Sequence, residues 1–192
     1  MCQQSGHCCC DQNIIVTLTY SDIYRLYLAL NKNFNRLIQK IIFYSLSTNS
    51  DKILQNQMVL NPIHSSDGLV IPGLRKFEGG RCIFYKQPNC MVYSKRPLAC
   101  QNYPFAFVKH QNKIAFTWVK NSINTCIGIE KGFPISDDEI KRLGRKFFEE
   151  IYNHNKLVEN LNLEASKDNP LSAREALWMM TFYAEKIEDR LV

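Results

Sequence analysis

Eight cysteines are the residues of this chain that could do chemistry, and most of them fall into two groups. A central stretch from Arg81 to Pro104 holds Cys82, Cys90 and Cys100. The N-terminus holds Cys2, Cys8, Cys9 and Cys10, and Cys126 follows alone near two glycines. Tetrahedral zinc takes four ligands, and an iron–sulfur cluster also takes four thiolates. We therefore expect the distant cysteines to meet in space around metal.

The spacing leaves the kind of metal site open. Seven residues separate Cys82 from Cys90 and nine separate Cys90 from Cys100, which matches neither a zinc finger nor a ferredoxin. Adjacent cysteines rarely bind one metal together, so eight thiols could serve two sites. Cys10, the third in its run, is predicted to pack as a small buried apolar residue. Disulfides or a nucleophilic cysteine paired with a histidine are alternatives, but nothing in the sequence selects one cysteine for such a pair.

Length and composition are those of an ordinary globular protein that does not need covalent cross-links to fold. The chain has 192 residues, so it can bury a sizeable core. Polar residues directly follow Met1-Cys2, and no apolar run reaches membrane-spanning length. We therefore expect a cytoplasmic protein without a membrane partner, in a compartment where thiols stay reduced.

Positive charge is concentrated in the part that carries the cysteines. Residues 1–130 hold 14 Lys or Arg against 6 Asp or Glu, whereas residues 131–192 hold 10 against 12. A basic domain can bind nucleic acid, but the sequence has no nucleic-acid-binding motif, so this partner is disfavoured. Thiolates bound to a metal carry negative charge, and nearby Lys and Arg would offset it.

Short strands and helices are expected around the cysteines, which predicts an α+β fold. Residues 14–19 form a β-branched run typical of a strand, and a helix capped by Ser21 or Asp22 should follow. Apolar spacing predicts a second helix over 34–42, and residues 57–85 read as short strands joined by turns. Residues 2–10 are expected to be a loop, and residues 105–109 and 114–120 are expected to pair as a hairpin. Two helices are expected at the C-terminus, the first of which begins with a capping box of Ser136 and Glu139. The predicted organisation is a metal-binding domain over 1–132 and a helical extension over 133–192, packed together as one globular unit.

The motifs resemble those of the YkgJ-type cysteine-cluster family, CxxCxxCC, a family of zinc- or iron-chelating domains that is related to flagellin lysine N-methylase. The family's CxxCGxCC motif is similar to residues 2–9, and its helix start is similar to Leu18-Thr19 with Asp22. Its central motif, C-x-x-Y-x-x-R-P-x-x-C-R-x-Y-P-F, is similar to residues 90–105, and its last cysteine is similar to Cys126. The chain departs from the family at Ser5, where the family has a cysteine, and at Gln101, where it has an arginine.

The residues and the resemblance together imply a set of ligands and two functions. The expected metal ligands are Cys2, Cys8, Cys9, Cys82, Cys90, Cys100 and Cys126, holding zinc or an iron–sulfur cluster. Arg96 is expected to bind an anion, a cofactor carboxylate or the negative charge of the cluster, or to clamp the turn at Pro97. The first function is metal binding, with a protein substrate or partner left open. The alternative, which rests on resemblance alone, is an enzyme similar to a protein lysine N-methyltransferase.

Overall fold

Helices and short antiparallel strands make up the protein, which confirms the α+β prediction. The structure is a computed structural model that describes residues 4–46, 59–111, 113–120, 122–131, 134–165 and 170–188. Its helices are α1 (His7–Cys10), α2 (Tyr20–Ala29), α3 (Phe34–Ile38), the 3-10 turn η2 (Tyr93–Lys95), α5 (Leu98–Asn102), α6 (Ser122–Thr125), α7 (Ile127–Lys131), α8 (Asp137–Glu164) and α9 (Ala173–Glu188). Its strands are β1 (Ile41–Ser45), β2 (Ile63–Ser65), β3 (Gly68–Leu74), β4 (Tyr85–Lys86), β5 (Asn89–Cys90), β6 (Phe105–His110) and β7 (Lys113–Trp118).

A three-stranded antiparallel sheet in the order β1-β3-β2 lies beside α2. Its central strand pairs Ile71 with Tyr44 of β1 and Val70 with Ile63 of β2. The second predicted helix was too long, because α3 ends at Ile38 and Ile41 and Ile42 belong to β1. These β-branched residues gain a ladder partner in β3, which outweighs their helical spacing.

The segment before α2 is extended but is not a full strand. Thr17 makes one antiparallel bridge to Gly73, and the Leu18 N–H donates to the Pro72 carbonyl at 2.9 Å. Thr19, rather than Ser21 or Asp22, caps α2. Its side chain accepts from the Asp22 N–H at 3.1 Å, and the Asp22 carboxylate accepts from the Thr19 N–H at 3.0 Å. The cap is therefore a capping box, in which two otherwise unpaired amides are satisfied reciprocally.

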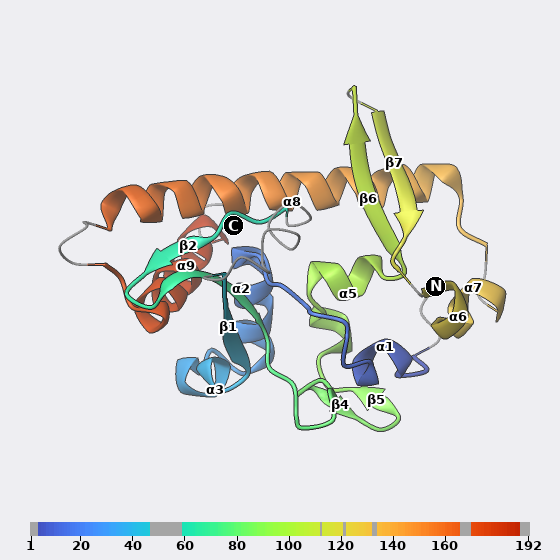
Figure 1. Ribbon diagram of the computed structural model, residues 1–192, viewed down its shortest axis with the longest axis horizontal. Coiled ribbons are helices and arrows are strands. Elements are labelled where there is room, and N and C mark those ends of the chain that lie inside the picture. Colours follow the sequence, from blue (N-terminus) through green and yellow to red (C-terminus); the bar gives the residue numbers. More distant parts are fainter. Residues whose placement is uncertain are drawn as a thin grey trace.

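The long helix α8 and the final helix α9 pack on α2 and share its core (Figure 1). As predicted, Ser136 caps α8, where it accepts from the Glu139 N–H. The shared cluster consists of apolar residues exposed by less than a tenth: Leu18, Ile23, Leu26, Leu157, Val158, Leu161, Leu177 and Met180 are among them. The two helices that were predicted as a C-terminal extension, α8 and α9, thus bury the apolar face of α2.

The predicted hairpin is confirmed as β6 and β7, which project past α8 in Figure 1. Phe107 packs on Phe147 of α8, with ring centroids 5.8 Å apart. Gly144 of α8 allows this approach, because a Cβ there would lie 2.5 Å from Ile114. Among the described residues, no helix has the length and apolar character needed to cross a bilayer.

Candidate metal centre

Cys8, Cys9 and Cys10 lie on a single helical turn, α1, where the sequence predicted a loop. The N–H groups of Cys9 and Cys10 donate to the Gly6 carbonyl at 3.0 and 3.1 Å. Gly6 itself has a φ of 77°, and a Cβ at this position would lie 2.1 Å from the Tyr85 hydroxyl oxygen. A glycine is therefore required both for the backbone conformation and for the close approach of α1 to Tyr85.

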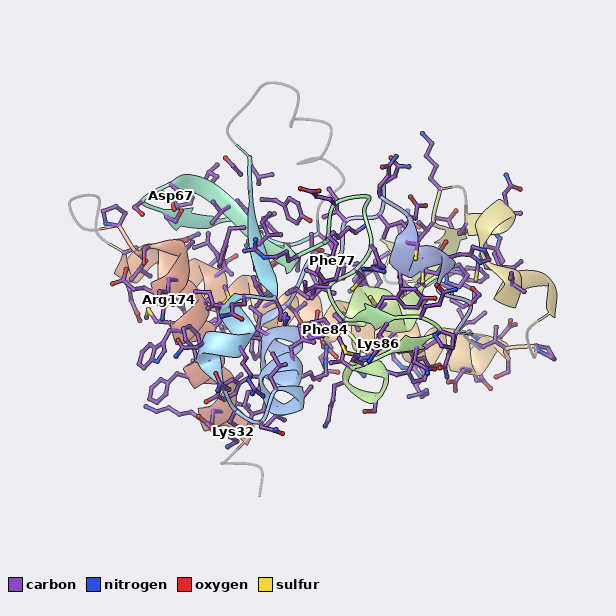
Figure 2. All side chains as sticks on the ribbon, turned by 90° about the horizontal axis from the view of Figure 1, so that it is seen from below. Lys32, Asp67, Phe77, Phe84, Lys86 and Arg174 are labelled. Atoms are coloured by element: carbon purple, nitrogen blue, oxygen red, sulfur yellow. The ribbon has the colours of Figure 1, made fainter. Side chains whose placement is uncertain are left out.

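Cys82 and Cys90 belong to the segment that follows β3, and this segment contacts α1. The Cys82 N–H donates to the Cys9 carbonyl at 2.7 Å, and Cys82 also makes an antiparallel bridge to Lys76. The β4–β5 hairpin then places Cys90 opposite Tyr85, the residue whose ring contacts Gly6. In Figure 2, Phe77, Phe84 and Lys86 mark the course of this segment beside α1.

Cys100 comes from a third segment, the short helix α5. Pro97 precedes α5 and makes no side-chain cap, and the first amide of the helix, on Leu98, donates to Asp22 Oδ1 at 2.7 Å. Cys82, Cys90 and Cys100 are partly buried and pack against the main apolar core. Figure 1 shows α1, the β4–β5 hairpin and α5 near one another below α8, between α2 and the pair α6 and α7.

Five thiols at this junction influence one another electrostatically: those of Cys8, Cys9, Cys82, Cys90 and Cys100. A hydrogen bond from Cys9 lowers the pKa of Cys8 to about 7, and the same bond raises the pKa of Cys9, so the pair shares a proton. Burial raises the pKa of Cys100 well above its ordinary value, and the neighbouring Cys82 and Cys8 add to the rise. These groups can become thiolates together only beside compensating positive charge.

Arg96 supplies part of that charge. Its guanidinium lies 3.9 Å from the centre of the Tyr93 ring and is one of the causes that lower the pKa of Cys8. The Arg96 Nε is buried without a hydrogen-bond partner in the described part of the chain. Gln101, which stands where the family has an arginine, donates to the Arg96 carbonyl at 2.6 Å. Lys76 similarly opposes the rise in the pKa of Cys82 that burial causes.

Cys126 lies between α6 and α7. It lines a cleft of about 430 Å³ together with His7, Cys10, Asp11, Ile123, Asn124 and Ile127. The prediction that Cys10 is buried was wrong, because its side chain is exposed and faces this cleft. Cys2 lies outside the described residues. Ser5, at the family's cysteine position, is exposed and forms a 3.2 Å hydrogen bond with His7 Nδ1.

The donor set at the junction fits a metal that prefers sulfur. The seven cysteines of the described part are present as thiols. Partly buried, clustered thiols with a neighbouring arginine provide the soft anionic ligands that zinc and iron–sulfur clusters take. In the segments that the structure describes, no three His, Cys, Asp or Glu side chains already stand in a coordination arrangement. The side chains would therefore have to turn toward a bound ion.

Sequence reasoning missed two residues that hold this junction together. Asp22 was predicted as a helix cap, and its contact with α5 has no signal in local sequence because 76 residues separate the partners. Tyr85 was predicted only as a strand residue. The glycine at position 6 was the available signal, since a glycine beside a cysteine run suggests close packing of another group.

Comparison with known proteins gives one match. A family model described as CxxCxxCC, putative zinc- or iron-chelating domain, matches residues 1–126. No curated protein and no solved structure matches the chain.

Proposed function

Because the chain belongs to the CxxCxxCC family of zinc- or iron-chelating domains, we propose that it binds zinc or an iron–sulfur cluster, in one or two sites, through thiols drawn from Cys8, Cys9, Cys82, Cys90 and Cys100. The observation that carries this proposal is the meeting of three distant segments, α1, β5 with the residues before β4, and α5, at one cluster of thiols. Residues 1–132 supply all the proposed ligands, and 133–192 form the helical extension. A cytoplasmic location is part of the proposal, because thiols stay reduced there and can bind metal.

Cys2 and Cys126 complete the proposed ligand set on different grounds. Cys2 precedes α1 by a few residues and can return to the cluster. Cys126 faces the cleft that it shares with His7 and Cys10 of α1, the helix that also carries Cys8 and Cys9.

Arg96 is proposed to balance the charge of the bound thiolates. Its place over the Tyr93 ring and beside Cys8 supports this role better than ligation of a separate cofactor. A bound zinc ion would serve structure or polarise a ligand, whereas an iron–sulfur cluster would carry electrons. In either case the chain's own contribution is to hold the thiols together and partly shield them from water.

A panel of single Cys→Ser variants tests the proposal by metal content per chain after purification without oxygen. We expect Cys82→Ser and Cys100→Ser to lose metal, and Cys10→Ser, on the same turn as Cys8 and Cys9 but facing the cleft, to keep it. Retention of full metal by both Cys82→Ser and Cys100→Ser would overturn the proposed cluster. Loss of metal in Cys126→Ser would support Cys126 as a ligand, and full retention would remove it from the set.

A further inference from the structure

Asp22 is a carboxylate with almost no exposure to water, at the point where α2 meets α5. Asp22 is 1% exposed to solvent. Asp22 Oδ2 accepts from the Thr19 N–H at 3.0 Å, while Oδ1 accepts from the Leu98 N–H at 2.7 Å and from Arg25 Nη2. A buried carboxylate is costly unless its oxygens are paired, so this set of donors explains how the charge is accommodated.

The hydrogen bond from the Leu98 N–H to Asp22 is not part of the capping box of α2. The first amides of a helix have no partner within the helix and need an acceptor from outside. Pro97, at the start of α5, provides no side-chain cap, and Asp22 meets this need for Leu98. Cys100 lies two residues later in the same short helix. Asp22 thus fixes where the turn that carries Cys100 begins.

Arg25, which pairs with Asp22, forms a second ion pair with Glu150. Arg25 donates to both carboxylate oxygens of Glu150 on α8, at 3.1 and 2.7 Å. Burial raises the pKa of Asp22, and Arg25 opposes that rise. The contacts Leu98–Asp22–Arg25–Glu150 therefore connect α5 with the long helix that spans the molecule.

We propose that Asp22 is a positioning residue for the metal centre, which holds α5, and with it Cys100, against α2 and α8. This inference rests on the proposed function in so far as Cys100 is a ligand. Asp22 does not touch the metal in this account. It acts by fixing the backbone of the helix from which one ligand projects.

Thr19→Ala is the matched control, because it breaks the capping box of α2 and leaves the Asp22 carboxylate free to cap α5. Losing such a cap costs about 1 kcal/mol of stability. Asp22→Ala removes the contacts with Thr19, Leu98 and Arg25, and Asp22→Asn keeps one acceptor oxygen for Leu98. If Asp22→Ala does not fold, Asp22→Asn provides the test, since it retains the shape and loses the charge.

Hydrogen exchange of the full-length, as-purified protein gives a readout that needs no metal. We expect the peptide that covers α5 to exchange at least about 10-fold faster in Asp22→Ala, while the peptide that covers α9 changes no more than in Thr19→Ala. Asp22→Asn should lie between Asp22→Ala and the wild type. Equal acceleration of both peptides in Asp22→Ala, or equal acceleration of α5 in Thr19→Ala, would show a global effect and overturn the proposal.

Zinc affinity, measured with Zn²⁺ against a competing chelator, provides the second readout. Residues that orient a ligand typically contribute about 10- to 100-fold to metal affinity, and we expect a loss in this range for Asp22→Ala and less than about 3-fold for Thr19→Ala. Faster exchange of α5 in Asp22→Ala, together with a wild-type protein that binds no zinc or iron, would retain the positioning role and refute the proposed function. Metal binding with unchanged α5 exchange and affinity in Asp22→Ala would refute the positioning role alone.

Discussion

Acid should destabilise this protein through His154, which is buried on α8. The ring accepts the Tyr20 N–H at Nδ1, at 3.0 Å, and its Nε2 is buried without a partner in the described residues. Burial lowers the pKa of His154 from 6.5 to about 4. Between these two pH values the unfolded chain binds a proton that the folded chain does not. Stability from this group is therefore complete above pH 6.5 and is lost as the pH falls toward 4.

The size of the effect follows from the difference between the two pKa values. Each unit corresponds to about 1.4 kcal/mol, so lowering the pH from 7 to 4 should remove about 3 kcal/mol of unfolding free energy. The assay is urea unfolding of the wild type and His154→Asn at both pH values. The Asn side-chain oxygen can accept the Tyr20 N–H but does not titrate, so the stability gap between the two proteins should shrink by about 3 kcal/mol in acid.

Comparison of two variants separates this proton effect from other effects of acid. Thiolates that lose metal in acid do so in both proteins, so their contribution cancels in the difference. Leu157→Ala, nearly one turn later in α8 and also buried, should cost about 2–5 kcal/mol equally at both pH values. A stability gap between wild type and His154→Asn that stays within about 0.5 kcal/mol from pH 7 to pH 4 would refute the reasoning, because the proton would then bind the folded and unfolded chains alike.

Three further predictions concern the junction and the core. Gly6→Ala should lose metal and at least about 1 kcal/mol more stability than Gly68→Ala, because both positions have positive φ but only Gly6 has Tyr85 within 4 Å; equal urea midpoints and metal contents would contradict this. Removing the metal with a chelator should speed hydrogen exchange in α1 and the β4–β5 hairpin while α2, α8 and α9 keep their protection, because those three helices share an apolar core; uniform loss of protection would instead mean that the metal carries the whole fold. Met180→Ala, fully buried, should cost about 2–5 kcal/mol in urea unfolding, whereas Trp178→Ala, 52% exposed on the same helix, should cost less than about 1; similar costs would place the α9 interface on the other face.

Local signals in the sequence predicted much of the fold. The capping residues before α8 and the alternating apolar residues of β6 and β7 marked both elements, since each signal depends on neighbours in the chain. The second helix was extended too far because Ile41 and Ile42 fit helical spacing, and only pairing with β3 makes them a strand. Thr19 was missed as a cap because Ser21 and Asp22, close by, have equally suitable side chains.

The site was predicted in its residues and not in its arrangement. Cysteine spacing indicated that the two groups would meet, and the structure brings Cys8 and Cys9 to the central three. The cleft that Cys126 shares with Cys10 could not be predicted, because it depends on where α6 and α7 pack. The cap that Asp22 provides for α5 is a contact between distant segments, and such contacts leave no periodic pattern in a single sequence.

The central claim is tested most directly by metal analysis together with a visible absorption spectrum of protein purified without oxygen. The account predicts zinc or iron bound to the chain, and acid-labile sulfide with a brown colour would identify an iron–sulfur cluster. Colourless protein with one or two zinc ions per chain would identify zinc thiolate sites. Protein that contains neither metal, with its thiols fully reactive, would contradict the claim that these cysteines form a metal centre.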